Sequence, residues 1–418
     1  MRRRNLIPAI STVAVVSLVA ACGGAGGPSG GGGKISDDKI VLGVLNDQTG
    51  IYAELSGPNG VKAVEMAVED FKAKHGDDAV SKNIEVVVAD HQNKPEIANT
   101  KAQEMYDRQK ADIILDVPTS SAALAVATQA KAKKKLFIDI SGATTALTGE
   151  SCNKYTFHYA YDTYMLANGT GTAVTQAGAK NWYIVYPDYA FGQDMEKSFS
   201  KAIETAGGKV LAKKPTEFPN TSGDFSSQLL QAPASNPDVL GTMHAGGELV
   251  NLVKQYNQFK LKDKGVGLSV GLMFITDIHS LGSDALAGTR FTDAWYWNFD
   301  EQNRQWADKF KEKTGSRPSF AHAGNYSATM AYLDAVQAAG TDASDDVVKN
   351  LEGKEINDFF LRNGKIRAED HRVIHDAYLA EVKPKSEVKE DYDYEKIVTT
   401  IPADKAFKPV SESTCKMG

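Results

Sequence analysis

Segments that favour strands alternate with segments that favour helices along most of this chain, and this alternation constrains the fold more than any other feature. Lys39–Asp47 (KIVLGVLND) is rich in β-branched residues, and Gly60–Lys74 repeats apolar residues at the helical period. Further strands are predicted over Asn83–Asp90, Ala111–Val117 and Lys135–Ser141, and further helices over Glu96–Lys110 and Ser121–Lys134. Nearly continuous apolar strands between helices predict a parallel sheet with helices on both faces.

The same order of elements begins again in the second half of the chain. A helix is predicted over Tyr164–Gly178 and a strand over Asn181–Tyr186 (NWYIVY). The pattern continues with strands over Val210–Glu217, Asp238–His244 and Val266–Ile275, and with helices over Gln193–Gly207, Phe225–Ala232 and Glu248–Phe259. The halves share this order without an obvious sequence repeat, so we expect two similar doubly wound halves.

A third segment follows, with strands predicted over Phe291–Asn298 and Ala377–Val382 and helices over Gln302–Thr314 and Tyr326–Ala339. We expect it to cross back between the halves, which would place a hinge and a cleft between two lobes. The predicted fold class is α/β, with two doubly wound parallel-sheet lobes joined by a multi-crossing hinge. We expect residues 38–157 and 290–363 in the first lobe, and residues 158–289 and 364–418 in the second.

The N-terminus has the layout of an export signal, with three arginines after Met1 and an apolar stretch up to Ala21. The end of this stretch, LVAAC, resembles the bacterial lipobox, in which the cysteine is lipidated after cleavage. We therefore expect a signal peptide over 1–21, a lipid anchor on Cys22 and a flexible glycine-rich tether over 22–37. This places the protein on the outer face of the cytoplasmic membrane, or on the periplasmic side of a membrane if two are present. The alternatives are a plain signal peptide with a chance cysteine, or an uncleaved anchor.

Charge, hydropathy and cysteine count limit the partners further. The formal net charge of −6 argues against nucleic acid, because an acidic surface repels phosphates. Beyond the N-terminus, no apolar run approaches the ~20 residues that a membrane span needs. With Cys22 assigned to lipid, Cys152 and Cys415 remain. Outside the cytoplasm the simplest arithmetic pairs them in a disulfide, and two free thiols are the alternative.

Two hydroxyl-rich turns follow neighbouring predicted strands and are the first candidates for a ligand site. One contains Thr119, Ser120 and Ser121, and the other is Ser141-Gly142-Ala143-Thr144. In open α/β sheets, ligands bind beyond the carboxyl ends of strands. Hydroxyls and free amides at a helix N-terminus suit a carboxylate or another anion. The alternative is that these hydroxyls only cap their helices.

Other strand ends supply further candidates. Tyr52 follows the first strand, and Tyr189 and Phe191 follow the first strand of the second half, where aromatic rings would sandwich an apolar or aromatic ligand. Packing within the second lobe is the alternative for Phe191. His244 and Asp277 end later strands of the second half. Asp277 would pair with an ammonium group, unless it is a solvated loop carboxylate.

Four segments in fixed order, NDQTGIYAELSG, PTSSAALAV, ISGATTALTG and YPDYAFGQ, resemble the solute receptors of ABC importers. The nearest class is the branched-chain amino-acid (Leu/Ile/Val) binding proteins of the type I periplasmic-binding fold, and the resemblance spans nearly all of 38–415. It implies that the turns Thr119–Ser121 and Ser141–Thr144 hold the ligand's carboxylate. It also implies that the second turn meets the ammonium, which an acidic residue near Asp277 completes.

The resemblance leaves the ligand open between an amino acid and an aromatic acid. The stretch NDFFLRNGKIR, together with the cysteine near the C-terminus, resembles a subgroup of generically described receptors, and some relatives of this class take aromatic carboxylates. Met243–Gly247 departs from the family's pattern, which often has aromatic residues there. The resemblance thus implies capture of a small carboxylate-bearing solute by closure of two lobes, like a Venus flytrap.

We expect this receptor to be monomeric, to need no cofactor or metal, and to deliver its solute to the permease subunits of an ABC transporter. A sensory module that lacks a permease is one alternative. An exported enzyme is the other, but the sequence contains no HExxH, G-x-G-x-x-G or P-loop pattern and no credible triad. His371 and His375 would stand ~13 Å apart on a strand at ~3.3 Å per residue, too far to share a metal.

Overall fold

The first sheet forms where the sequence has its buried aliphatic runs, and all of its strands are parallel. The computed structural model describes residues 35–78 and 80–417. The strands are β1 (Ile40–Asn46), β2 (Ile84–Asp90), β3 (Ile113–Leu115), β4 (Leu136–Asp139) and β5 (Thr156–His158), in the spatial order β2-β1-β3-β4-β5. This sheet confirms the four predicted strands and adds β5 at its edge.

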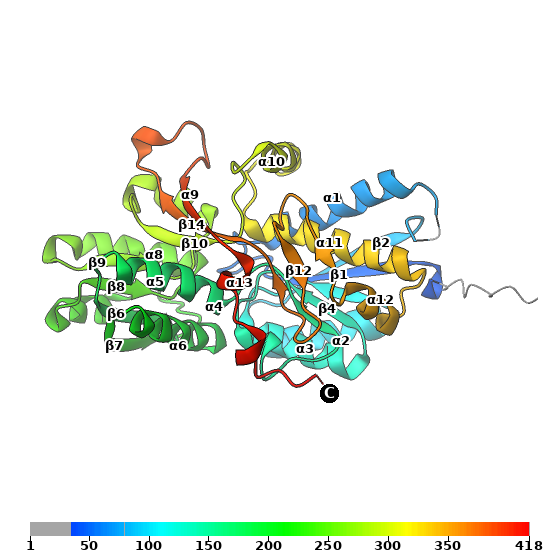
Figure 1. Cartoon of the computed structure of the whole chain (residues 1–418), viewed down its shortest axis with the longest axis horizontal. Helices are drawn as coiled ribbons and strands as arrows, with labels where there is room; N and C mark the ends of the chain where they lie inside the picture. Colours follow the sequence, from blue (N-terminus) through cyan, green and yellow to red (C-terminus); the bar gives the residue numbers. More distant parts are fainter. Residues whose placement is uncertain (1–34, 79, 418) are drawn as a thin grey trace, which may run out of the picture. The chain divides into compact units, whose positions relative to one another are not determined.

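Helices cover both faces of this sheet because successive side chains of a strand point to opposite sides. Leu42 and Val44 of β1 belong to the main core, which includes residues of α1 and α11. Val41 and Leu45 belong to a second cluster together with residues of α2 and α3. These helices are α1 (Gly57–His75), α2 (Pro95–Asp107), α3 (Ser120–Lys133) and α11 (Phe320–Ala339). Figure 1 shows α1 and α11 running side by side.

The second sheet repeats this arrangement. Trp182 and Ile184 of its central strand pack in the main core with Phe199, while Tyr183 and Val185 pack on the opposite face. Its strands are β6 (Asn181–Pro187), β7 (Lys209–Thr216), β8 (Val239–Thr242) and β9 (Gly267–Val270), all parallel, in the order β7-β6-β8-β9. Its helices are α6 (Ala190–Thr205), α7 (Ser226–Gln231), α8 (Gly246–Gln258) and a helical run from α4 (Thr163–Leu166) to α5 (Thr172–Gln176). The two doubly wound lobes are thereby confirmed.

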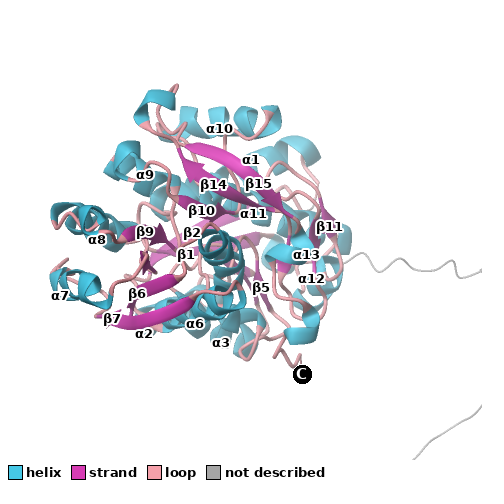
Figure 2. Cartoon of the chain, turned by 60° about the vertical axis from the view of Figure 1, so that its left-hand side comes forward, coloured by secondary structure: helices cyan, strands magenta, loops and turns pink. Residues whose placement is uncertain are grey.

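The third segment forms two small antiparallel sheets and further helices (Figure 2). One sheet consists of β10 (Arg290–Asp293), β14 (Ala377–Val382) and β15 (Glu395–Ile401), and the other of β11 (Glu355–Ile356), β12 (Gly364–Ile366) and β13 (Val373–Ile374). The helices are α10 (Glu301–Thr314), α12 (Ser344–Leu351) and α13 (Ala403–Ala406), besides α11. In chain order, the polypeptide passes from the first sheet to the second, returns through α10–α12, and leaves again through β14. The exact residue bounds of each lobe remain a prediction.

Several predicted strands are shorter than expected, and two of them end well before the predicted position. The strand predicted over Val266–Ile275 ends at Val270, and Ile275–Leu281 forms the helix α9. This helix begins there because the Asp277 carboxylate accepts a hydrogen bond from the Phe274 amide at 2.9 Å. The strand predicted over Phe291–Asn298 ends at Asp293, and the aromatic residues after it pack in the core instead. There the Trp295 indole donates to the Phe359 carbonyl oxygen at 3.0 Å.

The predicted disulfide between Cys152 and Cys415 is present, with the two Cα atoms 5.6 Å apart. It joins the loop before β5 to the C-terminal tail that follows α13. Near the bond, the Ser413 hydroxyl donates to the Thr148 carbonyl oxygen at 3.5 Å. The tail is therefore covalently attached to the first lobe.

Candidate functional site

One small cavity is lined by residues that follow the carboxyl ends of strands in both sheets, where open α/β sheets bind ligands. Its lining consists of Tyr52 and Leu55 after β1, Pro118 after β3, Ser141 after β4, Tyr189 and Phe191 after β6, Ala245 after β8, Leu272 after β9, and Tyr161 from the first crossing between the sheets. The cavity therefore brings together Tyr52, Tyr189 and Phe191 with Ser141 of the second predicted turn. Its largely apolar and aromatic lining is typical of small-molecule sites.

Aromatic rings from both lobes meet in this cavity. The hydroxyl oxygens of Tyr52 and Tyr189 lie 2.8 Å apart, and the Tyr189 ring stacks on Phe218 with 3.7 Å between centroids. The Tyr161 hydroxyl donates to the Ser141 carbonyl oxygen at 2.7 Å. Burial raises the pKa of all three tyrosines well above the ordinary value, so their hydroxyls are neutral near pH 7. A ligand would thus meet uncharged aromatic surface.

The two hydroxyl-rich turns lie next to each other because β3 and β4 are neighbours. Thr119 is the N-cap residue of α3, and its hydroxyl donates to Asn93. The Ala143 amide donates to the Ser120 hydroxyl oxygen at 3.4 Å. The half-buried Ser121 has no hydrogen-bond partner for its hydroxyl within residues 35–78 and 80–417. Since the first amides of α3 also lack acceptors within the helix, this end keeps donors for an anion.

Buried carboxyl groups lie behind Ser141. The Ser141 hydroxyl donates to Asp116, which also accepts from the Asn46 side-chain amide at 3.0 Å. Asp139 accepts from the Gly142 amide at 3.3 Å. Burial, together with the charge of the nearby Asp116, raises the pKa of Asp139 to about 8. Asp139 is therefore mostly protonated at neutral pH, which lowers the negative charge beside the predicted anion turns.

Thr144 is bonded to a residue of the other lobe. It caps a short 3-10 helix over Thr145–Thr148, where its hydroxyl oxygen accepts from the Ala146 amide at 3.3 Å. The same hydroxyl donates to the Asp194 carboxylate on α6 at 3.1 Å. Asp194 was not a predicted site residue, because a residue inside a helix carries no sequence signal for a partner 50 residues away.

His244 and Asp277 follow strands of the second lobe but do not line the cavity. The two ring nitrogens of His244 lie 2.8 Å from the Thr216 hydroxyl and 3.0 Å from the Thr242 hydroxyl. Burial lowers the pKa of His244 to about 3, so the ring is neutral. Asp277 is engaged at the start of α9, and burial raises its pKa to about 7. Both side chains have partners within the second lobe.

Glu248 is a buried acid that the sequence did not single out. It lies in the first turn of α8. Acidic residues are common at that position of a helix, so the sequence gives no sign that this one is buried. One carboxylate oxygen accepts from the Asn220 amide at 2.7 Å, and the other has no partner in the described part of the chain. Burial raises the pKa of Glu248 to about 7. Its charge also raises the pKa of Tyr52 and Tyr189. Gly246, two residues before Glu248, adjoins the Tyr52 ring, which would lie 3.2 Å from a Cβ atom at that glycine.

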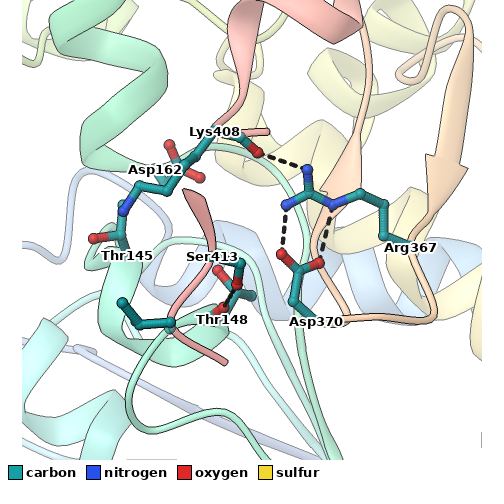
Figure 3. A pocket seen from close by; sticks show the side chains of 9 residues that line it. Thr145, Thr148, Asp162, Arg367, Asp370, Lys408 and Ser413 are labelled. Atoms are coloured by element: carbon teal, nitrogen blue, oxygen red, sulfur yellow. Dashed lines mark hydrogen bonds and ion pairs between the residues drawn. The ribbon is translucent and has the colours of Figure 1, made fainter. Parts of the chain in front are cut away.

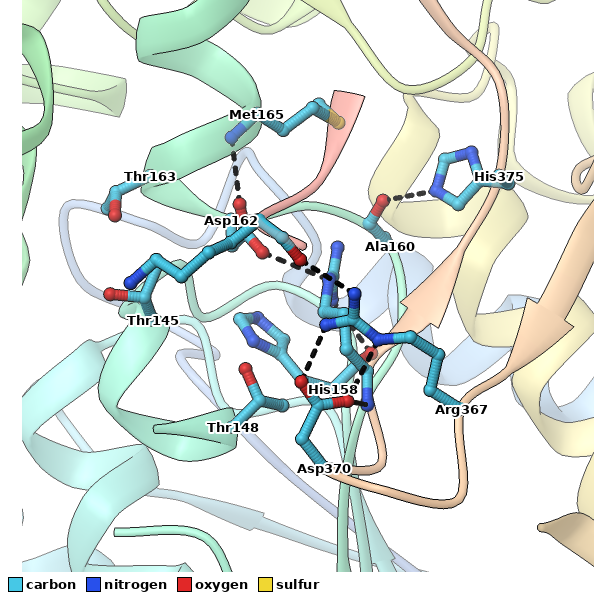
Figure 4. A network of polar contacts seen from close by, with 12 residues as sticks. Thr145, Thr148, His158, Ala160, Asp162, Thr163, Met165, Arg367, Asp370 and His375 are labelled. Carbon is cyan, nitrogen blue, oxygen red and sulfur yellow. Dashed lines mark hydrogen bonds and ion pairs between the residues drawn. The ribbon is translucent and has the colours of Figure 1, made fainter. Parts of the chain in front are cut away.

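Two arginines connect the segments that cross between the lobes. Arg367 forms an ion pair with Asp370 at 2.6 Å and donates to the Lys408 carbonyl oxygen at 2.6 Å, as Figure 3 shows. Arg372 is buried and pairs with Asp162 at 3.0 Å. Asp162 also accepts a hydrogen bond from the Met165 amide at 2.8 Å (Figure 4). These contacts join the first crossing, the β12–β13 region and the C-terminal tail. They give the predicted hinge a charged, buried centre.

The remaining predictions concern metal, membrane and lipid. The two histidines considered for a metal site have other partners. The Nε2 atom of His371 lies 3.0 Å from a carboxylate oxygen of Glu352, and the Nε2 atom of His375 lies 2.6 Å from the Ala160 carbonyl oxygen. Within residues 35–78 and 80–417, no cluster of three or more His, Cys, Asp or Glu side chains is suited to a metal ion. Among the same residues, no helix combines the length and apolar character needed to cross a bilayer. The lipidation site predicted at Cys22 lies outside the described residues.

Comparison with known proteins adds independent information. The family model of periplasmic binding proteins matches residues 39–387. The chain is similar to a periplasmic binding protein from Burkholderia mallei, with 43% identity over 91% of this chain and 99% of that chain, and a TM-score of 0.87. It is also similar to a branched-chain amino acid ABC transporter periplasmic ligand-binding protein from Burkholderia xenovorans, with 33% identity over 91% and 100% of the two chains, and a TM-score of 0.79. A solute-binding protein of an ABC transporter from Rhodopseudomonas palustris, in complex with 3,4-dihydroxybenzoic acid, shares the fold at 22% identity, 88% and 98% coverage, and a TM-score of 0.76.

Proposed function

This chain belongs to the periplasmic binding protein family, and from that premise we propose that it is the extracytoplasmic receptor of an ABC importer. It captures a small carboxylate-bearing solute between its two lobes and presents it to permease subunits. The observation that carries this proposal is the cavity lined by residues from the strand ends of both sheets. A ligand that touches both walls favours the closed form by its contacts to each lobe, and the permease distinguishes closed from open.

The chemistry of the cavity supports a ligand with an apolar or aromatic body. Tyr52, Tyr161, Tyr189 and Phe191 supply rings, and the cavity lining contains no charged side chain. The carboxylate would be held by the first turn of α3, where the Ser121 hydroxyl and the helix amides remain available. The relatives named for branched-chain amino acids and for 3,4-dihydroxybenzoic acid agree with such a ligand class.

Glu248 provides a test that distinguishes amino acids from aromatic acids as ligands. Its unpartnered carboxylate oxygen near Tyr52 and Tyr189 would pair with the ammonium group of an amino acid, whereas an aromatic acid has no such group. Glu248→Gln should therefore weaken the binding of amino acids and spare aromatic acids. Because the pKa of Glu248 is raised to about 7, amino-acid affinity should also increase as the pH rises through 7 and Glu248 ionises.

A thermal-shift screen of amino acids and aromatic carboxylates tests the proposal. A ligand present at 100 times its Kd adds about 2.7 kcal/mol to the free energy of unfolding, which raises the melting temperature of a chain this long by about 3 °C. We expect members of one carboxylate class to produce this shift, and the Glu248→Gln variant then reports which class. If only uncharged solutes stabilise the protein, the proposed carboxylate site is wrong.

We also propose that the protein is exported and attached to the membrane by lipid on Cys22. The Cys152–Cys415 disulfide supports an oxidising location. A lipid on Cys22 would keep the receptor near its permease. Mass spectrometry of the purified protein should find an acylated N-terminal peptide that begins at Cys22, and Cys22→Ser should release the protein from the membrane fraction.

A further inference from the structure

A carboxylate of the protein itself occupies the turn that the sequence predicts to bind an anion. Asp194 of the second lobe accepts hydrogen bonds from the Thr144 hydroxyl at 3.1 Å, the Thr145 amide at 2.7 Å and the Thr145 hydroxyl at 3.0 Å. The Thr163 hydroxyl at the start of α4 donates to the same carboxylate at 2.8 Å. Thr144 and Thr145 follow β4 of the first lobe, so these bonds join the two lobes.

A second pair of residues makes a similar contact. The Gly247 amide at the start of α8 donates to the Ile51 carbonyl oxygen of the first lobe at 3.1 Å. The neighbouring Gly246 has a φ of 56°, and a Cβ atom there would lie 2.6 Å from the same oxygen. The approach of the two backbones therefore requires glycine at this position. Both contacts join one lobe to the other, so opening of the cleft would separate their partners.

These contacts lie apart from the ligand cavity. Neither Asp194 nor Thr145 is among the residues that line it. Both line a different cavity, between α6 and the C-terminal tail, to which Lys197 and Lys408 also contribute. A change at Asp194 therefore alters the contact between the lobes while the ligand-facing rings stay the same.

We propose that Asp194 is a closure latch, which sets the population of the closed form and thereby the affinity for every ligand without touching any of them. This inference rests on the proposed function. When a ligand binds only the closed form, its apparent Kd equals the intrinsic Kd divided by the closed fraction. Loss of the latch lowers that fraction, so it weakens all ligands by one common factor. A residue that touches the ligand would instead change their ranking.

Asp194→Asn tests the latch, with Asp188→Asn as the matched control. The Asn side chain has the same shape as Asp but lacks the negative charge. It also has only one acceptor oxygen, whereas Thr144 and Thr145 donate to the carboxylate of Asp194. Asp188 lies just before α6, and Asp188→Asn removes the same charge. Its carboxylate, however, accepts a hydrogen bond from the Gln193 side-chain amide in its own lobe. We expect Asp194→Asn to raise the Kd of each binding carboxylate about tenfold, mainly through faster dissociation, and Asp188→Asn to leave it unchanged.

A measurement without ligand separates the latch from the proposed function. Small-angle X-ray scattering of ligand-free protein should give a larger radius of gyration for Asp194→Asn than for the wild type and for Asp188→Asn. This comparison is valid even if no carboxylate binds, which would refute only the proposed function. Equal radii for all three proteins would overturn the latch. So would an Asp194→Asn variant that binds every ligand as the wild type does, or that changes their order of affinity.

Discussion

Breaking the Cys152–Cys415 disulfide should lower the free energy of unfolding by several kcal/mol. The bond closes a loop with a sequence separation of 263 residues. The chain-entropy relation gives ~19 cal/mol/K for a loop of this length, or about 5.6 kcal/mol at 25 °C, and measured effects reach ~5 kcal/mol. We therefore expect a loss of about 3–5 kcal/mol. The folded state should survive, because few contacts near the bond depend on it.

The contacts of the tail support this expectation. Lys201 and Glu412 form an exposed ion pair at 3.0 Å, worth at most ~1 kcal/mol, whereas Phe407 is buried beneath the guanidinium of Arg372. Without the bond, the tail should loosen only beyond Phe407. The bond therefore acts mainly by restricting the unfolded chain.

Urea unfolding followed by tryptophan fluorescence, with and without a thiol reductant, measures this effect. With an m value of ~3–4 kcal/mol/M for a chain this long, the midpoint should fall by about 1 M on reduction. A Cys152→Ser/Cys415→Ser double variant should unfold like the reduced wild type and ignore the reductant. Coincident midpoints for oxidised and reduced wild type would refute the reasoning.

Two further predictions concern buried charges. The Asp139 carboxyl has a pKa of about 8 in the folded protein and about 3.8 in the unfolded chain. Between pH 3.8 and pH 8 the folded protein therefore binds one more proton at this group than the unfolded chain does. The free energy of unfolding consequently falls as the pH rises towards 8. Urea midpoints at pH 6.5 and 8 should therefore differ less for Asp139→Asn than for the wild type, and an equal pH slope would contradict the raised pKa. Arg372→Met should cost about 3–5 kcal/mol in the same assay, because it leaves the buried Asp162 without its cation, 3.0 Å away. The control Lys62→Met breaks an exposed ion pair with Glu65 and should cost less than ~1 kcal/mol. Similar losses of stability for the two variants would show that the Arg372–Asp162 pair does not stabilise the fold more than a surface pair.

Much of the fold follows from the sequence, because strands buried on both faces consist of short aliphatic runs that are easy to recognise. β1, β4 and β6 arise from such buried runs, whereas β2, at the edge of the first sheet, has a similar apolar run that is only half-buried. The short strand β5 has no such signal, since it consists of three residues, Thr156–His158, which pair with β4 and form one bridge with Arg372. The helix α9 was missed for a different reason. Its apolar residues continue the run of β9, and only the hydrogen bond of Asp277 marks its start.

The candidate site was predicted where strand ends carry distinctive side chains and missed where the contact depends on tertiary structure. Tyr52 and Tyr189 follow clear strands and do line the cavity. Tyr161 comes from the crossing segment, which no periodicity identifies. His244 also follows a strand, but its ring nitrogens contact the hydroxyl of Thr216 at the end of β7 and that of Thr242 in its own strand, β8. Its strand-end position was visible in the sequence, whereas these partners were not.

The proposed site for a small carboxylate-bearing solute is the cavity between the lobes. Calorimetric titration of the wild type and of Tyr189→Ala, with the solute that gives the largest thermal shift, tests this site. We expect one bound solute per chain in the wild type. We also expect a loss of at least tenfold in affinity for Tyr189→Ala, because that change removes a ring from the cavity and the hydroxyl that lies 2.8 Å from the Tyr52 hydroxyl. Equal affinity of a correctly folded Tyr189→Ala variant would contradict it.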